Sequence, residues 1–171
     1  MDIMEKTKFT FDLQQIRDEV RFYTEKYPQQ QIGLTHSINA TTLEERMNEA
    51  TGTNVLGSLK KDADFVIFNK DFNGTLLQTM FETLSTEYRL CRFRIMTMSG
   101  PSTYYAHSDI SQRLHYAVET NKDCIFLFPE IQQQLFIPQD GFVYQIDTRH
   151  RHTFVNASKI TRIHLLLSLF P

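Results

Sequence analysis

Three residues of this 171-residue sequence have the types and spacing of a metal-binding set. His107 and Asp109 form a His-x-Asp triplet, and His152 follows later in the chain. If His107 and Asp109 lie on a strand, their side chains project to the same side, and a histidine from a neighbouring strand can complete a three-point face. Two neutral imidazoles and one carboxylate favour a borderline transition metal over Ca²⁺ or Mg²⁺, which prefer all-oxygen ligands.

This ligand set leaves other coordination positions open, which is typical of non-haem Fe(II) oxygenases. The open positions matter because a co-substrate and O₂ must both reach the metal. A His-x-Asp triplet is a weak signal by itself, since composition alone produces it at an appreciable rate. The alternative is that His107 and Asp109 are a hydrogen-bonded pair on the surface.

Arg162 is a second residue that could do chemistry, because it begins an otherwise apolar predicted strand over 162–169. An unpaired guanidinium that faces the interior of a barrel is costly, so we expect it to meet an anion there. Its planar fork suits a carboxylate held at two points. The alternative is that Arg162 lies at the solvated end of the strand and pairs with an acidic neighbour.

The elements that must position these residues lie in the second half of the chain. From Arg89 onward, short runs rich in β-branched and aromatic residues alternate with turn signals. We predict eight strands there, over 92–98, 103–107, 113–119, 124–129, 134–138, 141–147, 152–156 and 162–169. His107 and Asp109 then close the second strand, His152 opens the seventh and Arg162 opens the eighth.

The first half is predicted to be mostly helical. Helix starts are indicated by Asp12, with Gln15 three positions on, and by Thr41 with Glu44, and an apolar stripe begins at Leu76. A mobile loop is expected over 51–58. The predicted fold class is α+β and mainly β: a double-stranded β-helix (jelly-roll or cupin-like) core, with the N-terminal helices packed on one sheet.

Length and composition fit one domain over 1–171, with a helical supporting and substrate-mouth region over 1–88 and a catalytic core over 89–171. The formal charge of −2 gives no basic bias, so we expect no nucleic-acid partner. The longest apolar stretch, 163–170, is too short to span a membrane, and 1–12 lacks the apolar core of a signal peptide. The two cysteines indicate a reducing compartment. We therefore expect a cytoplasmic protein without a membrane partner.

A series of spaced elements in the second half resembles the aspartyl/asparaginyl β-hydroxylase-like family of 2-oxoglutarate- and Fe(II)-dependent dioxygenases. The resemblance covers about residues 89–169 and is weak before them. The elements occur in order along the chain: His107-Ser-Asp109, Arg113-Leu-His115, Thr120-Asn121-x-x-Cys124, Gly141-x-x-Tyr144, Asp147-Thr148-Arg149, His152-Thr-x-x-Asn156 and Arg162-Ile-His164-Leu165.

The resemblance implies a role for each of five residues. His107, Asp109 and His152 would hold Fe(II). Arg162 would bind the distal carboxylate of 2-oxoglutarate, the co-substrate, and His115 would also contact it. Because some family members have glycine where Asp109 stands, the retained acid favours hydroxylation over halogenation.

Three further residues have two interpretations each. Arg113 would bind co-substrate or substrate, or it is an exposed strand arginine. Arg94 resembles a family position near the co-substrate and would contact co-substrate or substrate. His164, two positions after Arg162, either lines the pocket or is a hydrogen-bonded core histidine.

The function implied by the resemblance is hydroxylation of an amino acid or a protein side chain of the Asp, Asn or Pro type, with O₂ consumed and succinate and CO₂ released. Two other classes remain open. One is a cupin-like metalloenzyme that does not use 2-oxoglutarate, because jelly rolls host many chemistries. The other is a metal-free jelly-roll binding module in which the histidines are incidental.

Overall fold

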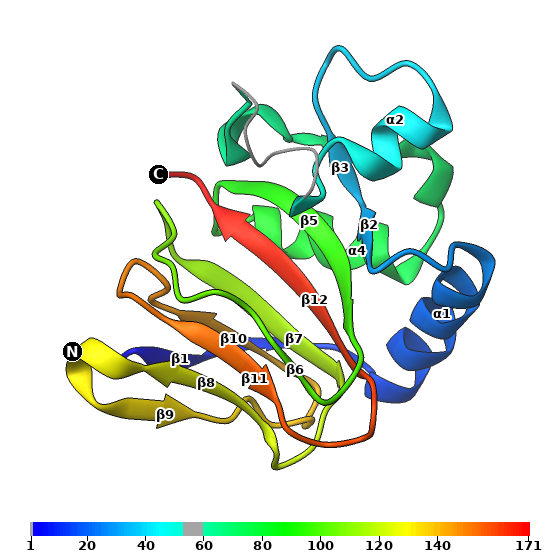
Figure 1. The fold of residues 1–171 in the computed structure, drawn as a ribbon. Helices are drawn as coiled ribbons and strands as arrows, with labels where there is room; N and C mark the ends of the chain where they lie inside the picture. The colour runs from blue at the N-terminus through cyan, green and yellow to red at the C-terminus, as the bar shows by residue number, and fades with distance from the viewer. Residues whose placement is uncertain (1, 53–59) are drawn as a thin grey trace.

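The computed structural model describes residues 2–52 and 60–171, so the predicted loop over 51–58 lies, from residue 53 on, outside the described residues. Two antiparallel sheets face each other (Figure 1). The six-stranded sheet has the order β1 (Met4–Thr10), β10 (Phe142–Ile146), β7 (Arg113–Glu119), β12 (Arg162–Leu169), β5 (Leu90–Met98) and β2 (Gln31–Gly33). The four-stranded sheet has the order β6 (Ser102–Thr103), β11 (Thr153–Asn156), β8 (Cys124–Phe128) and β9 (Gln133–Leu135).

The predicted jelly roll with helices on one sheet is confirmed. The strands predicted over 113–119 and 162–169 have the predicted bounds, and five others differ by one to three residues at one or both ends. The strand predicted over 103–107 is wrong in its length: β6 ends at Thr103, and His107 forms only an isolated bridge with His152.

Strand β12 explains how one sheet serves two purposes. Its odd-numbered residues, Ile163, Leu165 and Leu167, join the apolar core beneath the helices. Its even-numbered residues project to the opposite face, as the two-residue period of a strand requires, and Arg162 and Leu166 line a cavity between the sheets. The same alternation on β5 sends Phe93 into the core.

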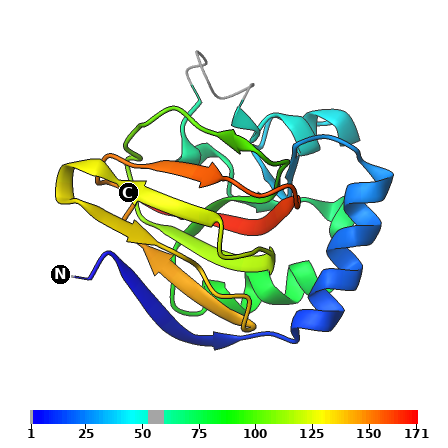
Figure 2. The same cartoon turned by 60° about the horizontal axis from the view of Figure 1, so that its bottom comes forward.

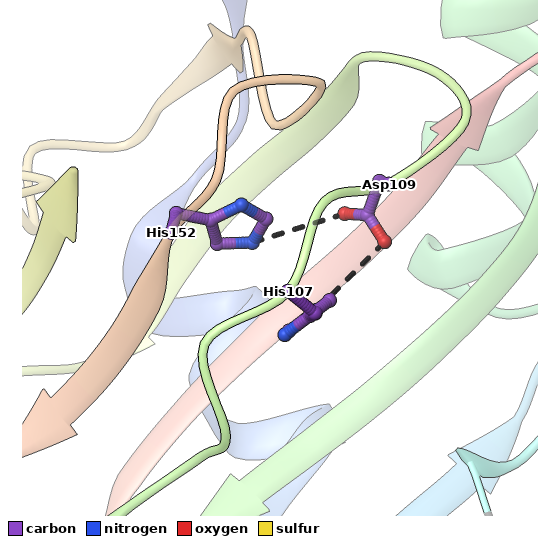
Figure 3. Close-up of side chains that lie close together, drawn as sticks. All are labelled: His107, Asp109 and His152. Atoms are coloured by element: carbon purple, nitrogen blue, oxygen red, sulfur yellow. Dashed lines mark ion pairs between the residues drawn. The ribbon is translucent and has the colours of Figure 1, made fainter. Parts of the chain in front are cut away.

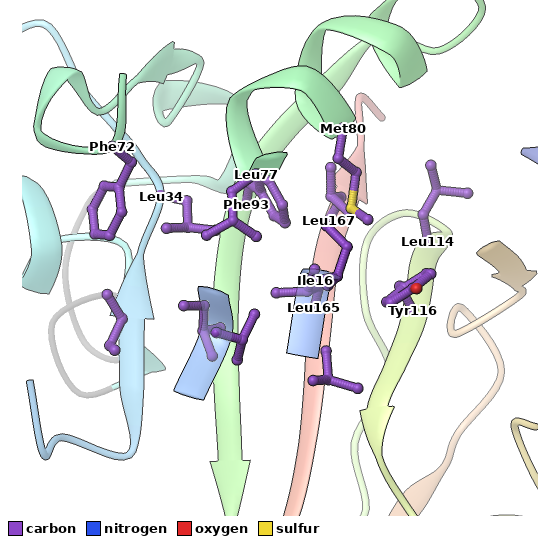
Figure 4. Close-up of a cluster of buried hydrophobic side chains, with 14 of the residues drawn as sticks. Ile16, Leu34, Phe72, Leu77, Met80, Phe93, Leu114, Tyr116, Leu165 and Leu167 are labelled. Atoms are coloured by element: carbon purple, nitrogen blue, oxygen red, sulfur yellow. The ribbon is translucent and has the colours of Figure 1, made fainter. Parts of the chain in front are cut away.

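Within residues 2–52 and 60–171, the α-helices with given bounds are α1 (Leu13–Lys26), α2 (Leu43–Asn48) and α4 (Leu76–Ser85). Helices α1 and α4 cover the outer face of the six-stranded sheet (Figure 2). Their apolar stripes pack on it through Ile16 and Val20 of α1 and through Leu77, Met80 and Leu84 of α4. Figure 4 shows Ile16, Leu77 and Met80 in this core. The packing fixes the sheet from outside and leaves its inner face free for the site.

The first half contains more strands than expected. Strand β1 pairs with β10 and β2 pairs with β5, so both extend the main sheet, and β3 (Thr35–His36) pairs with β4 (Ile67–Phe68). Strand β1 escaped prediction because it is an edge strand whose lysines lie exposed, so it has no apolar alternation. The part of the chain that the structure describes also contains the short 3₁₀ helices η1 (Asp62–Asp64), η2 (Lys70–Phe72) and η3 (Pro129–Ile131).

The helix starts are close to those predicted. The Asp12 carboxylate caps α1 by accepting a hydrogen bond from the Gln15 backbone N–H at 2.9 Å. The capping box of α2 lies one residue later than the predicted pair, because Thr42 and Glu45 make its reciprocal hydrogen bonds. Among the described helices, none combines the length and the apolar character needed to cross a membrane.

Candidate metal centre

The three residues of the predicted metal set converge at one end of the space between the sheets (Figure 3). One potential ligand atom from each of His107, Asp109 and His152 lies within 4.8 Å of the others. Each histidine Nε2 is 3.9 Å from an oxygen of the Asp109 carboxylate. These separations are too long for hydrogen bonds and leave room for an ion, so a hydrogen-bonded surface pair does not describe His107 and Asp109.

A backbone bridge brings the two histidines together. The His107 N–H donates to the His152 carbonyl at 2.9 Å, and the His152 N–H donates back at 2.8 Å. Asp109 is held beside them because its N–H donates to the Thr148 carbonyl at 2.9 Å. The set is therefore assembled by this bridge and not by the alternation of a regular strand.

Both imidazoles are oriented in the same way. Nδ1 of His107 lies 2.8 Å from the Tyr105 carbonyl, and Nδ1 of His152 lies 2.9 Å from the His150 carbonyl. A carbonyl can only accept, so each Nδ1 carries the proton and each Nε2 presents its lone pair. Burial lowers the pKa of His152, which keeps this imidazole neutral, as a metal ligand must be.

Arg113 on β7 fixes the carboxylate of the set. Its Nε and Nη2 donate to the two Asp109 oxygens at 3.0 and 2.7 Å in a two-point contact. Burial alone would raise the pKa of Asp109, but the Arg113 guanidinium outweighs it and brings the pKa to about 2. Asp109 is therefore anionic at any physiological pH.

A second buried carboxylate, Asp62 of η1, completes this ion-pair network and was missed by sequence reasoning. It lies 2.8 Å from Nη1 of Arg113 and 2.8 Å from Nη1 of Arg92, and it accepts a hydrogen bond from Ser168 at 2.9 Å. Burial opposes its ionisation, yet the neighbouring arginines lower the pKa of Asp62. No local motif marks this aspartate, since its partners are 30 or more residues away.

The metal set opens onto a cavity of about 410 Å³ between the two sheets. The cavity is large enough for a small organic ligand together with an ion. It is lined by Gln31, Gly52, Arg92, Arg94, Met96, Tyr104, His107, Asp109, Arg113, His115, Phe126, Thr148, His152, Phe154, Arg162 and Leu166.

Arg162 lies in this cavity, buried and without an acidic partner. Its Nη2 contacts Nδ1 of His164 at 2.6 Å, its guanidinium stacks on the Phe154 ring at 3.9 Å, and its Nε has no hydrogen-bond partner in the described part of the chain. Burial lowers the pKa of Arg162 to about 10, which still leaves it charged at neutral pH. The surface alternative for Arg162 is wrong, and the expected unpaired guanidinium is present.

Other polar atoms without partners gather around Arg162. Both ring nitrogens of His115, Nε2 of His164 and the hydroxyl of Tyr104 are buried without a hydrogen bond to any described residue. Burial lowers the pKa of His115 and of His164 well below the ordinary value, so both rings are neutral. Buried polar groups are rarely left unpaired, so this part of the cavity is shaped for a polar ligand.

The two remaining predicted residues are also buried. Arg113 is not an exposed strand arginine, because its guanidinium is occupied by Asp109, Asp62 and Ser168. Arg94 on β5 lines the cavity and donates from Nη1 to Gln31 Oε1 at 3.0 Å, and its Nε has no partner among residues 2–52 and 60–171. Arg94 is thus available to a ligand, whereas Arg113 is committed to its carboxylates.

The sequence matches no protein-family model and no curated protein. Solved structures do match. A truncated viral collagen prolyl hydroxylase from Paramecium bursaria Chlorella virus-1 aligns with a TM-score of 0.57 and 9% identity, over 98% of this chain and 89% of that one. Its 2-oxoglutarate complex aligns with a TM-score of 0.52 and 11% identity, over 98% and 96% of the two chains.

A third similar structure is an oxidoreductase of the 2OG-Fe(II) oxygenase family from Burkholderia pseudomallei, with a TM-score of 0.54 and 17% identity, over 97% of this chain and 82% of that one. At these identities the likeness concerns the fold. The narrower resemblance to the aspartyl/asparaginyl β-hydroxylase-like family stays a prediction. The chain has the jelly-roll fold that these 2OG-Fe(II) oxygenases share.

Proposed function

We propose that this protein is a 2-oxoglutarate- and Fe(II)-dependent dioxygenase that hydroxylates an amino acid or an amino-acid side chain of a protein, of the Asp, Asn or Pro type. One observation carries the proposal: a His-Asp-His set and a buried arginine without an acidic partner line the same cavity. A metal-only site would not need the arginine, and an anion site alone would not need the two oriented imidazoles.

The donor set fits Fe(II). His107 and His152 offer Nε2 lone pairs and Asp109 offers a carboxylate oxygen, which is the ligand set of non-haem Fe(II) oxygenases. Arg113 orients that carboxylate as an outer partner of the metal set. Bound Fe(II), together with 2-oxoglutarate and O₂, would convert a substrate C–H bond to C–OH, with succinate and CO₂ as the other products.

The residues toward Arg162 fit the co-substrate. The Arg162 fork would bind the distal carboxylate of 2-oxoglutarate, and His164 holds the guanidinium from the other side. His115 projects from β7 opposite Leu166 of β12, between the Arg162 end of β12 and the Arg113 end of β7. The rings of Phe126 and Phe154 line the same space and would exclude water from it.

The proposal is tested by binding and by turnover. Under anaerobic conditions we expect wild-type protein to bind Mn(II), as a stand-in for Fe(II), and then 2-oxoglutarate, both saturably in calorimetry. With Fe(II) and O₂ it should release succinate. Arg162→Met should raise the Kd for 2-oxoglutarate at least about 30-fold, because a charged two-point contact is lost.

A matched control is Arg89→Met, the same change at an exposed arginine, which should alter neither affinity. Metal binding with unchanged activity in Arg162→Met would instead indicate a cupin-like metalloenzyme without 2-oxoglutarate. Failure of wild-type protein to bind metal would indicate a metal-free binding module.

A further inference from the structure

Arg94 is a second arginine of the cavity that has no acidic partner. Its side chain is almost wholly buried. Among the described residues, the hydrogen bond from Nη1 to Gln31 Oε1 is the one that satisfies a donor of Arg94, and Nε has no partner. No described carboxylate lies within 4.0 Å of it, and the residues outside the described ranges, Met1 and 53–59, include no aspartate or glutamate. Arg94 is therefore a buried cation that the chain itself does not neutralise.

The charged residues around the cavity show where positive charge remains in excess. Arg92 and Arg113 face Asp62, and Arg113 also faces Asp109, so two arginines are balanced by two carboxylates. Arg94 and Arg162 remain unbalanced. A buried uncompensated charge is costly, so both positions are expected to receive an anion from outside the chain.

The two unbalanced arginines occupy different parts of the cavity. On the paired strands, Arg162 lies opposite Met98, whereas Arg94 lies opposite Leu166, four residues further along β12. Their backbone positions are therefore about 13 Å apart along the strand direction. His115 lies opposite the same residue, Leu166, as Arg94 does. Arg113, which holds the metal-set carboxylate, lies opposite Ser168, two residues further along β12.

The surroundings of the two arginines differ as well. Arg162 contacts the Phe154 ring and Nδ1 of His164, whereas Tyr104 is close enough to be influenced by both arginines. Arg94 is influenced by Arg92, Arg113, Asp62 and Asp109, the charged network at the metal end. An anion bound by Arg94 would therefore lie nearer the candidate metal set than an anion bound by Arg162.

We propose that Arg94 binds the carboxylate of the substrate, so that the substrate is a carboxylate-bearing amino acid or a peptide that presents a carboxylate. This inference rests on the proposed function, in which Arg162 is taken by 2-oxoglutarate. Gln31 acts as a positioning residue: its Oε1 accepts from Arg94 and also from the Gly52 N–H at 3.0 Å, so it ties the guanidinium to the backbone.

The test is a set of anaerobic titrations of protein saturated with Mn(II) and 2-oxoglutarate. The probes are L-proline, L-aspartate and L-asparagine, each beside its α-amide, and N-acetylated, C-amidated peptides that contain Asp, Asn or Pro. We expect at least one carboxylate to bind, and its amide counterpart to bind at least about 30-fold more weakly. Binding of free amino acids assigns an α-carboxylate, and binding of the Asp peptide alone assigns a side-chain carboxylate.

Two variants remove the anion site in different ways. Arg94→Met deletes the charge at nearly constant length, and Gln31→Glu supplies a carboxylate beside Arg94 without changing its size. Both should raise the Kd for the carboxylate probe at least about 30-fold and change the Kd for 2-oxoglutarate by no more than about twofold. Both should also keep or raise the Tm of the metal-free protein, which shows that they fold.

The inference is overturned if no carboxylate of the panel binds or if the amides bind equally well. It is also overturned if Arg94→Met weakens the binding of 2-oxoglutarate and not the binding of the probe. Each of these outcomes leaves the proposed function standing. The proposed function fails separately, when wild-type protein binds neither Mn(II) nor 2-oxoglutarate in the first step of the experiment.

Discussion

The two faces of the six-stranded sheet are built from alternate residues of the same strands, yet they differ in how their groups are satisfied. On the helix side, side chains such as Phe93, Leu165 and Tyr116 are fully buried in one apolar cluster. On the cavity side, Arg162, His115 and their neighbours are equally buried but carry polar atoms without partners. The polar and apolar groups of the outer face are satisfied within the fold, whereas the inner face leaves buried polar atoms that a ligand would satisfy.

A second contrast lies within the inner face. Arg113 is neutralised by two carboxylates, while Arg162, on the adjacent strand, has none. Burial is the same for both guanidiniums, so the difference lies in the ion pairs. An arginine with internal partners contributes to stability, and one without them is held by the fold at a cost that binding can offset.

The largest expected effect comes from breaking the paired arginine. Arg113→Met should lower the free energy of unfolding by about 3–5 kcal/mol, because Asp109 and Asp62 would be left as buried charges. Urea denaturation of the metal-free protein measures it. Arg162→Met is the control and should leave this free energy unchanged or raise it. Equal losses in both variants would contradict the contrast.

Substitutions at two adjacent leucines allow the packing of the two faces of the sheet to be compared directly. Leu165→Ala, on the helix side, should cost about 2–5 kcal/mol in urea denaturation, because the closed core cannot refill the space. Leu166→Ala, on the cavity side, should cost less, because its side chain already borders open volume. The metal affinity of Leu165→Ala should equal that of wild type. A reversed order of the two losses would show that the cavity side is the packed one.

Substitution of a residue of the metal set should reduce metal affinity with little loss of stability. His107→Ala should weaken Mn(II) binding by about 100-fold, because one of three donors is lost, and change the stability of the metal-free protein by less than about 1 kcal/mol. His107 is half-exposed, which explains the small structural cost. Calorimetric titration measures the affinity. His150→Ala, at a histidine of similar exposure beside Asp147, should bind Mn(II) as wild type does.

The smallest effect is a pH dependence of stability. The pKa of His164 is well below its ordinary value because of burial, so the folded state binds fewer protons than the unfolded state. The contribution of neutral His164 to the free energy of unfolding is present above about pH 6.5 and is lost as the pH falls below that value. The loss is about 1 kcal/mol between pH 7 and pH 5.5. His164→Gln should flatten the profile of urea-denaturation free energy by that amount. An unchanged profile would mean that the pKa of His164 is the same in the folded and the unfolded state.

The sequence predicted the second half of the fold well because its strands carry strong local signals. Strands β7 and β12 combine β-branched and aromatic residues with clear ends, and their bounds agree with the prediction. Strand β1 could not be recognised, since its pairing with β10 depends on residues more than 130 positions away. Four of its seven side chains are exposed and its one buried residue is a threonine, so the strand leaves no apolar alternation.

The candidate site was predictable to the extent that its residues are rare types at suggestive spacing. His107, Asp109 and His152 were found in this way, and the fold brings them together. The partners of the arginines were not predictable. Asp62 reaches Arg113 from a short 3₁₀ helix that has no marker in the sequence, and only the packing of η1 against β5 places it there.

The bridge between His107 and His152 has a consequence for how the site is assembled. The same two residues that offer imidazoles to an ion also join their backbones by a reciprocal pair of amide hydrogen bonds. A bound metal ion would therefore link residues 107 and 152 across the intervening chain. It would also stabilise the two amide hydrogen bonds between them. Hydrogen–deuterium exchange at positions 107 and 152 should slow when metal is added and quicken when a chelator removes it.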